Sequence, residues 1–187
     1  MGQGSVLGLG EPGLRDARPA DAAAVAAVQA RAWRAAYLDL LDTERLEQLS
    51  SDALFGVWRQ ALATLPQRHA VLVATAGEHV VGVAAVGPSP DPDAAGTDGE
   101  LSVLLVDPAH QRQGHGSRLL SAAARTGADA GFTRLRTWTP AADQARRGFL
   151  AEAGLEPDGA SRRFEGPGGR PVAEIRMSAL ILTDGRS

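Results

Sequence analysis

An apolar run from Leu101 to Val106, interrupted only by Ser102 and ended by Asp107-Pro108, constrains the fold of this chain more than any other feature. Such a run, without regular polar alternation, is typical of a strand that is buried on both faces of a sheet. A helical pattern from Gly114 to Ala130 and a further strand from Thr133 to Thr139 are expected after brief links. Strand, helix and strand in this order predict a right-handed parallel crossover. The core is therefore expected to form around one buried strand and the helix that follows it.

Apolar periodicity and turn residues predict the elements on both sides of this unit. Helices are expected over Asp21–Ala36, Thr43–Leu49, Asp52–Ala63 and Ala141–Ala153. Strands are expected over Leu14–Ala17, Ala70–Ala76, His79–Val86, Ser161–Phe164 and Val172–Leu180, with a polar loop over Pro88–Gly99 and a glycine-rich turn over Gly166–Gly169. Early strand pairing, a crossover and a final hairpin indicate the α/β (α+β) class, with a mixed sheet and helices on both of its faces.

Length and composition indicate one domain. The 187 residues are 44% hydrophobic and 22% charged, which suits a globular core. We expect this domain over residues 13–182, between a flexible glycine-rich tail at 1–12 and a short tail at 183–187. Gly8, Gly10 and Gly13 have the G-x-G-x-x-G spacing of dinucleotide-binding proteins. Pro12 and the extended run after it interrupt the strand–turn–helix order that this motif requires, so we reject that interpretation.

Composition and charge exclude several classes of function. The absence of cysteine excludes disulfides, thiolate zinc sites and cysteine nucleophiles, and the four scattered histidines indicate no metal site. A net charge of −3 argues against nucleic acid as a partner, and no apolar run approaches the roughly 20 residues of a membrane span. The N-terminus lacks the pattern of a signal peptide, so we expect a cytoplasmic protein. All 19 basic residues are arginine, which together with abundant Ala and Gly is typical of a GC-rich bacterial genome.

The segment from Gln111 to Leu120 carries the strongest chemical signal. A polar loop runs from the buried strand into Gly114-His115-Gly116 and directly into a helix. A helix N-terminus offers unpaired N–H groups and a partial positive charge, and glycine lets an anion approach the backbone closely. The turn has no Lys followed by Ser or Thr, so it is not a P-loop. The pattern predicts a site for a diphosphate.

The wider pattern, Val106-x-Pro108, then Gln111-x-x-Gly114-x-Gly116, then Arg-Leu-Leu, resembles the acetyl-CoA signature of bacterial GNAT acetyltransferases. The resemblance implies a GNAT fold of about seven mostly antiparallel strands, in which one parallel pair splays apart at a bulge. It implies acetyl-CoA as co-substrate, no metal, and a strand N–H that polarises the thioester carbonyl. The cofactor contacts that it implies are Leu104, Leu105 and Val106 for the pantetheine arm and Gln111, Arg112, Gln113, Gly114, His115, Gly116 and Ser117 for the pyrophosphate.

A second match to the family lies between Asp143 and Leu155. The spacing of Asn-x-x-Ala-x-x-Phe-Tyr-x-x-x-Gly-Phe is kept, Phe149 and Gly154 match, and Asp143 replaces the Asn as a cofactor-binding candidate. Leu150 stands where the family often has a Tyr that protonates the departing CoA thiolate. Either solvent or another hydroxyl serves instead, or the enzyme is slow, or the chain is not an active enzyme. The arginines of this part of the chain are expected on the solvated surface, with one a candidate for the 3′-phosphate of CoA: Arg146, Arg147, Arg162 and Arg163.

The resemblance also supplies candidate catalytic and acceptor residues. Glu100 matches the position of the general base in the histone-acetylating branch of the family, and the alternative is a solvated or capping glutamate. Trp33 and Tyr37 match a pattern that lines the acceptor groove in bacterial members, and the alternative is core packing of the first helix. Trp138 is a further candidate for the acceptor site, whereas Trp58 is expected in the core.

Three functions stay open from the sequence. The favoured one is an N-acetyltransferase that moves an acetyl group to the primary amine of a small molecule or exposed peptide by direct attack on the thioester. The second is acetylation of a protein α-amine or lysine. The third is a non-catalytic acyl-CoA-binding module, which Leu150 keeps open. Many relatives pair, so a homodimer is expected.

Overall fold

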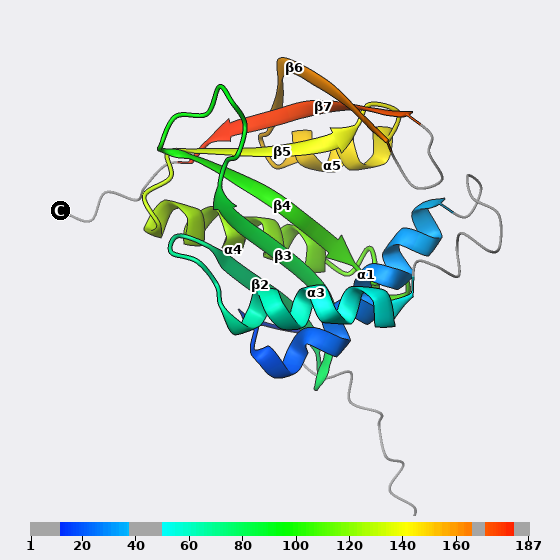
Figure 1. The fold of residues 1–187 in the computed structure, drawn as a ribbon. Coiled ribbons are helices and arrows are strands. Elements are labelled where there is room, and N and C mark those ends of the chain that lie inside the picture. The colour runs from blue at the N-terminus through cyan, green and yellow to red at the C-terminus, as the bar shows by residue number, and fades with distance from the viewer. Residues whose placement is uncertain (1–11, 38–49, 166–170, 182–187) are drawn as a thin grey trace, which may run out of the picture.

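The computed structural model describes residues 12–37, 50–165 and 171–181 (Figure 1). Its framework is a seven-stranded sheet in the order β1-β2-β3-β4-β5-β7-β6. The strands are β1 Pro12–Asp16, β2 Ala70–Ala76, β3 His79–Pro88, β4 Asp98–Val106, β5 Arg134–Pro140, β6 Glu156–Glu165 and β7 Pro171–Leu180. The α-helices of the described residues are α1 Ala22–Tyr37, α3 Ser51–Ala63, α4 His115–Asp129 and α5 Gln144–Glu152. Only β4 and β5 pair in parallel, so the predicted mixed, mostly antiparallel sheet is confirmed.

Several element boundaries differ from the predicted ones. Strand β1 begins at Pro12, and β4 begins at Asp98 rather than Leu101, because polar residues there still pair with neighbouring strands. Strand β6 begins at Glu156 rather than Ser161, since an edge strand needs no apolar pattern. Helix α5 begins three residues later than predicted, where Asp143 caps it. The predicted tails up to residue 11 and from 183, the helix Thr43–Leu49 and the turn Gly166–Gly169 lie outside the described residues.

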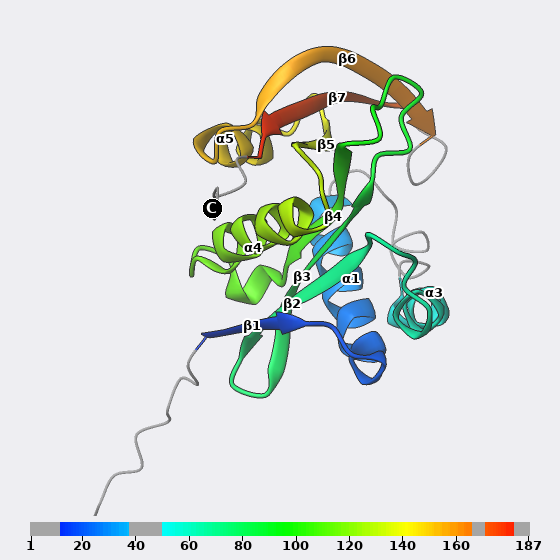
Figure 2. The ribbon, with the colours of Figure 1, turned by 90° about the vertical axis from the view of Figure 1, so that its left-hand side faces the viewer.

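Helices cover both faces of the sheet, as Figure 2 shows for α4 on one side and α1 and α3 on the other. The alternation of β2 explains the two cores: Val71 and Val73 pack with α1 and α3, and Leu72 and Ala74 pack on the α4 side. Helix α5 adds the fully buried Leu150 to the α4 side. Both faces of the central strands are therefore buried, which accounts for their continuous apolar sequence.

Strands β4 and β5 pair only at their beginnings and then diverge. Their parallel register joins Asp98–Glu100 to Arg134–Arg136 and ends there, and Figure 1 shows the strands separating beyond that point. On the other edge of β4, Leu101 and Val103 face consecutive residues of β3, so Ser102 is the extra residue of a β-bulge. The predicted splayed parallel pair is confirmed, with the bulge next to the point of separation.

A buried ion-pair network fixes the loop between β3 and β4 to the other half of the sheet. Arg176 of β7 pairs with Asp91 and Asp93 of the loop at 2.9 and 2.7 Å, and with Asp158 of β6 at 2.8 Å. Arg136 of β5 pairs with Asp98 at 2.8 Å. The hydrogen bonds of Arg176 lower the pKa of Asp93 to about 2. The network holds the strand ends near Glu100 in a defined position.

Replacing Arg176 by Met is expected to lower the free energy of unfolding by about 3–5 kcal/mol, because it leaves the buried carboxylate of Asp91 without its partner. Urea unfolding followed by circular dichroism at pH 7 measures this loss. Arg163→Met is the matched control, since Arg163 is exposed on β6, and it should change the value by less than about 0.5 kcal/mol. Equal losses in the two variants would contradict a special role of the network.

Candidate functional site

The turn that enters α4 has the geometry of an anion cradle. Gly114 is the residue before the helix and adopts a left-handed conformation with φ of 79°, and Arg112 is left-handed with φ of 62°. Gly114 is the N-cap residue and makes no side-chain hydrogen bond to the first turn. The backbone N–H groups of the helix N-terminus are therefore not capped by this residue. A Cβ on Gly116 would lie 3.5 Å from the ring of Phe149, which is ordinary van der Waals contact, so a side chain here would lie against Phe149 at the cavity wall. The turn thus offers bare backbone at a helix N-terminus, which suits a diphosphate.

A cavity of about 780 Å³ opens in front of this turn, between α4, α5 and the separated end of β4. Its lining residues are Leu104, Val106, His110, Gln111, Arg112, Gly114, His115, Gly116, Ser117, Gln144, Ala145, Arg146, Gly148, Phe149 and Glu152. Eight of the predicted cofactor residues are in this set, so the predicted cofactor contacts and the lining of the cavity largely coincide. We call it the cradle cavity.

Three of the predicted cofactor residues do not line the cradle cavity. Leu105 packs on the α1 side of the sheet, because side chains alternate along β4. Asp143 caps α5 by accepting a hydrogen bond from the N–H of Arg146 at 2.9 Å, which is the ordinary role of an Asp at that position. Gln113 accepts a long hydrogen bond of 3.5 Å from Arg118 through its carbonyl group.

Arg146, which the sequence offered only as one of four candidates for the 3′-phosphate of CoA, lines the cradle cavity. Its guanidinium donates a hydrogen bond of 3.1 Å to the carbonyl oxygen of Leu104, on the edge of β4 that β5 leaves unpaired. Arg147 bonds the carbonyl of Ala141, and Arg162 forms an ion pair with Glu174 at 2.6 Å. Arg146 and Arg147 are half-buried, so the expectation of solvated arginines does not hold for them, whereas Arg162 and Arg163 are exposed as expected. The folded chain presents carbonyl and carboxylate partners that a linear pattern does not reveal.

His115 contributes a buried, neutral ring beside the cradle. The guanidinium of Arg118 can only donate, so its contact of 3.1 Å to Nδ1 of His115 makes Nδ1 the acceptor and leaves the proton on Nε2. Burial, followed by the charge of Arg118, lowers the pKa of His115. The ring packs edge-on to His110, with 6.5 Å between the centroids. His115 is thus neutral at pH 7.

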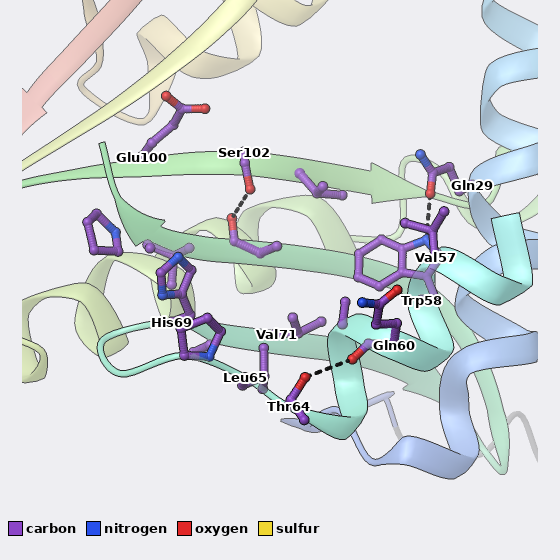
Figure 3. Close-up of a pocket in the computed structure, with 18 of the residues that line it drawn as sticks. Gln29, Val57, Trp58, Gln60, Thr64, Leu65, His69, Val71, Glu100 and Ser102 are labelled. Atoms are coloured by element: carbon purple, nitrogen blue, oxygen red, sulfur yellow. Dashed lines mark hydrogen bonds between the residues drawn. The ribbon is translucent and has the colours of Figure 1, made fainter. Parts of the chain in front are cut away.

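A second cavity of about 950 Å³ lies on the opposite side of β4, between the strands and α1 and α3 (Figure 3). Trp33 and Glu100, two of the predicted site residues, line it together with Trp58 and Ser102. Trp58 is also a core residue, as expected, and its Nε1 donates to Gln29 at 2.6 Å. We call it the α3 cavity. The α3 cavity is lined by a tryptophan of α1, by apolar side chains of α3 and by the carboxylate of Glu100 on the central strand.

Of the other two predicted acceptor residues, Tyr37 is the last residue of α1, and its side chain lies outside the described part of the structure. Trp138 does not line the α3 cavity. It points to the ion-pair network instead: its Nε1 donates to Asp91 at 3.2 Å, and the guanidinium of Arg162 lies 4.2 Å from its ring centroid. The sequence could not separate Trp138 from Trp33, because their placement depends on the sheet register and on the loop between β3 and β4.

Glu100 carries a carboxylate that is only partly satisfied. Among the described residues its Oε2 is buried without a hydrogen-bond partner. Burial raises the pKa of Glu100, and the nearby charge of Asp91 raises it further, against a smaller lowering by Arg162. A half-buried carboxylate with a raised pKa holds a proton more tightly than an exposed one, which favours a role as general base.

The two cavities meet β4 at adjoining segments. Glu100, Ser102 and Val103 line the α3 cavity, whereas Leu104 and Val106 line the cradle cavity. The bulge at Ser102 lies at this change of side. An anionic ligand in one cavity and a second ligand in the other can therefore approach each other at the middle of β4. Within the described residues, no helix is long and apolar enough to cross a membrane, and no group of three His, Asp or Glu side chains could hold a metal.

Comparisons with known proteins agree with this geometry. The sequence profile of the Acetyltransferase (GNAT) family matches residues 28–155. No curated protein matches the chain significantly. Similar solved structures include PaiA N-acetyltransferase from Thermoplasma acidophilum in complex with coenzyme A, with a TM-score of 0.67, 16% identity, and coverage of 91% of this chain and 99% of that one. Another is yncA from Salmonella typhimurium with acetyl-CoA, with a TM-score of 0.68, 20% identity, and coverage of 94% and 96%. The ribosomal-protein-S18-alanine N-acetyltransferase from Escherichia coli has a TM-score of 0.65, 18% identity, and coverage of 94% and 97%.

Proposed function

Since this chain belongs to the Acetyltransferase (GNAT) family, we propose that it transfers the acetyl group of acetyl-CoA to the primary amine of an acceptor. The observation that carries this proposal is the meeting of two cavities at the bulge of β4, one with a diphosphate cradle and one with a half-buried carboxylate. A reaction between two substrates needs two binding sites that bring the reacting atoms close together. The proposed acceptor site is the α3 cavity.

The cradle cavity suits acetyl-CoA in shape and in charge. The left-handed Gly114 and the N-terminus of α4 suit the pyrophosphate, and Arg112 and Arg146 add positive charge to the cavity wall. The backbone of Leu104 lies on the unpaired edge of β4, where an extended amide chain can add as a strand does. Acetyl-CoA supplies an activated acyl group. Solved relatives hold coenzyme A or acetyl-CoA.

Glu100 is the proposed general base. Most amines are protonated at pH 7, so a nearby group has to take a proton before the nitrogen can attack. The carboxylate lines the α3 cavity, and its raised pKa makes it a better base than an exposed glutamate. The proton passes from the ammonium group of the acceptor to the carboxylate of Glu100, directly or through one water.

Arg146 is the proposed electrostatic partner of the departing thiolate. Leu150 is fully buried and has no proton to give, so it cannot replace the Tyr of the family pattern. Arg146 lies one helical turn earlier on α5, and its guanidinium reaches the Leu104 segment of β4. A permanent positive charge stabilises a thiolate without protonating it.

An Arg146→Met variant is expected to raise the pKa of the bound CoA thiol by about one unit and to lower kcat roughly tenfold. The thiolate absorbance of CoA bound to the protein, followed against pH, measures the first effect. Arg147→Met is the matched control. The side chain of Arg147 is next to Arg146 in the sequence, but it donates to the carbonyl oxygen of Ala141 and does not line the cradle cavity. An unchanged thiol pKa in Arg146→Met would remove this role from Arg146, even if the overall activity fell.

Two other functions have a specific observation in their favour. A protein α-amine as acceptor is favoured by the likeness to the S18-alanine acetyltransferase, although that likeness rests on the fold. A non-catalytic acyl-CoA-binding module is favoured by Leu150. Steady release of CoA thiol in the presence of an amine separates the enzyme from such a module. A cytoplasmic location in a bacterium and a homodimer stay expectations from the sequence.

The first test is isothermal titration of the purified chain with acetyl-CoA and CoA, with NAD as the control ligand. Micromolar binding of both CoA forms, with no response to NAD, supports the proposal and justifies an assay of thiol release with a panel of amines. Absence of binding to either CoA form would remove the cofactor assignment and the proposed function with it.

A further inference from the structure

We propose that the acceptor is a primary amine with an apolar body of about aromatic-side-chain size and without an anionic group. This inference rests on the proposed function, because it assigns the substrate class of the same site. It is carried by the lining of the α3 cavity, where Glu100 is the one carboxylate among the described residues and the α3 helix supplies apolar side chains (Figure 3).

The walls of the α3 cavity are apolar along the path that leads to Glu100. Trp33 of α1 and Leu54 and Trp58 of α3 form one wall, and Val71 of β2 and Val103 of β4 belong to the opposite one. An acceptor with an apolar body would remove this surface from water, which is the main source of affinity in such a cavity. A highly polar acceptor would gain nothing from it.

The outer rim of the cavity carries large apolar side chains beside the polar Gln60 and Thr64. Val57 and Leu65 line the cavity, and they are 64% and 41% exposed, respectively. Large apolar side chains that stay exposed beside a cavity are typical of a surface that a ligand covers. The volume of about 950 Å³ lies at the upper end of the range for small-molecule sites, so it has room for a ring with a short alkyl chain.

The charge of the cavity selects an acceptor that is cationic and not anionic. Glu100 is the only Asp, Glu or Arg among the described residues that line it, and its Oε2 lacks a partner. An ammonium group would supply that partner. The arginines whose charges act on Glu100, Arg162 and Arg176, are already paired with Glu174 and with the aspartates of the network.

A carboxylate or phosphate on the acceptor would therefore meet no guanidinium among the lining residues that the structure describes, and it would be repelled by Glu100. His69 is the one further titratable side chain of the wall, and its Nδ1 is engaged by the carbonyl oxygen of Gln67 at 3.0 Å. Polyamines are also disfavoured, because a second ammonium would find no second carboxylate among these residues. Amino acids and phosphorylated amines are thus poor acceptors, and apolar monoamines are good ones.

The test compares phenethylamine with phenylalanine, which differ by one carboxylate, in the release of CoA thiol from acetyl-CoA. We expect kcat/KM to be at least roughly 100-fold higher for phenethylamine. Spermidine and a peptide with N-terminal alanine complete the panel, and both should react more slowly than phenethylamine. Titration with acetyl-CoA on the same preparation shows whether the cofactor binds.

A pair of variants tests the charge argument directly. Gln60→Arg places a guanidinium at the rim of the cavity. It should lower the ratio of kcat/KM for phenethylamine to kcat/KM for phenylalanine about tenfold. Gln67→Arg is the matched control, because Gln67 is exposed and its side chain does not line the cavity, and it should leave the ratio unchanged.

The possible outcomes separate this inference from the proposed function. Loss of acetyl-CoA binding overturns the proposed function itself. Binding of acetyl-CoA with equal use of phenylalanine, or faster use of spermidine or of the peptide, overturns the substrate class while the acetyltransferase stands. Binding without transfer to any of the four amines overturns both the substrate class and the enzyme, in favour of a binding module. Preference for phenethylamine that Gln60→Arg narrows supports the inference.

Discussion

A double variant with Gly114→Asp and Gly116→Asp is expected to weaken acetyl-CoA binding by more than about 100-fold. The two carboxylates would stand where the pyrophosphate is expected, at the N-terminus of α4, and like charges repel strongly there. The side chain at residue 116 would lie against Phe149, with its Cβ 3.5 Å from the ring, and would occupy part of the cradle cavity. Isothermal titration with acetyl-CoA measures the loss.

The matched control for this variant is Gly131→Asp. Gly131 follows the opposite end of α4 and is left-handed like Gly114, with φ of 83°, and a Cβ there meets nothing within 4 Å. The backbone strain of the substitution is therefore similar, about 1 kcal/mol, whereas the cradle is untouched. Equal loss of binding in the two proteins would mean that strain, and not the cradle, explains the effect.

Local signals made the central part of the fold predictable. The strand at Leu101–Val106 is apolar except for the bulge residue Ser102, because both of its faces are covered, and Gly114 takes the left-handed conformation of the turn into α4. Both properties leave a mark within about fifteen consecutive residues. The same is true of β2 and β3, whose apolar residues and two-residue turn predict the observed hairpin.

The parts that sequence reasoning missed depend on partners far away in the chain. Arg146 finds the carbonyl of Leu104 across the gap between β4 and β5, which exists only after the sheet has formed. Trp138 turns toward Asp91, 47 residues earlier, and Asp91 in turn pairs with Arg176. Trp33 lines the α3 cavity and Trp138 does not, and that difference depends on the register of β5 and on the loop before β4. The residues of the cradle cavity lie in two short segments of the chain, whereas the α3 cavity is built from distant contacts, so a family pattern is more informative for the first cavity than for the second.

A Glu100→Gln variant is expected to lower kcat by about 100-fold or more, because it removes the proposed general base and keeps the size of the side chain. The wild-type rate should rise with pH through the raised pKa of Glu100, since only the ionised carboxylate accepts a proton. In the Gln variant this acidic limb should disappear. Thiol release with phenethylamine as the acceptor, measured from pH 5 to 9 at saturating acetyl-CoA, checks both effects.

Stability and binding distinguish a catalytic role of Glu100 from a structural one. Burial raises the pKa of Glu100 in the folded state, so the folded protein holds this proton more tightly than the unfolded chain does. The resulting stabilisation is complete below the unfolded-state pKa and is lost as the pH rises through the folded-state pKa. The neutral Gln avoids this loss, so the variant should be at least as stable as the wild type at pH 8 and bind acetyl-CoA equally well. Glu78→Gln, at an exposed turn, is the control for both measurements. A Gln variant that keeps a near-normal kcat across the pH range would leave Glu100 as a solvated or capping glutamate and would require another base for the reaction.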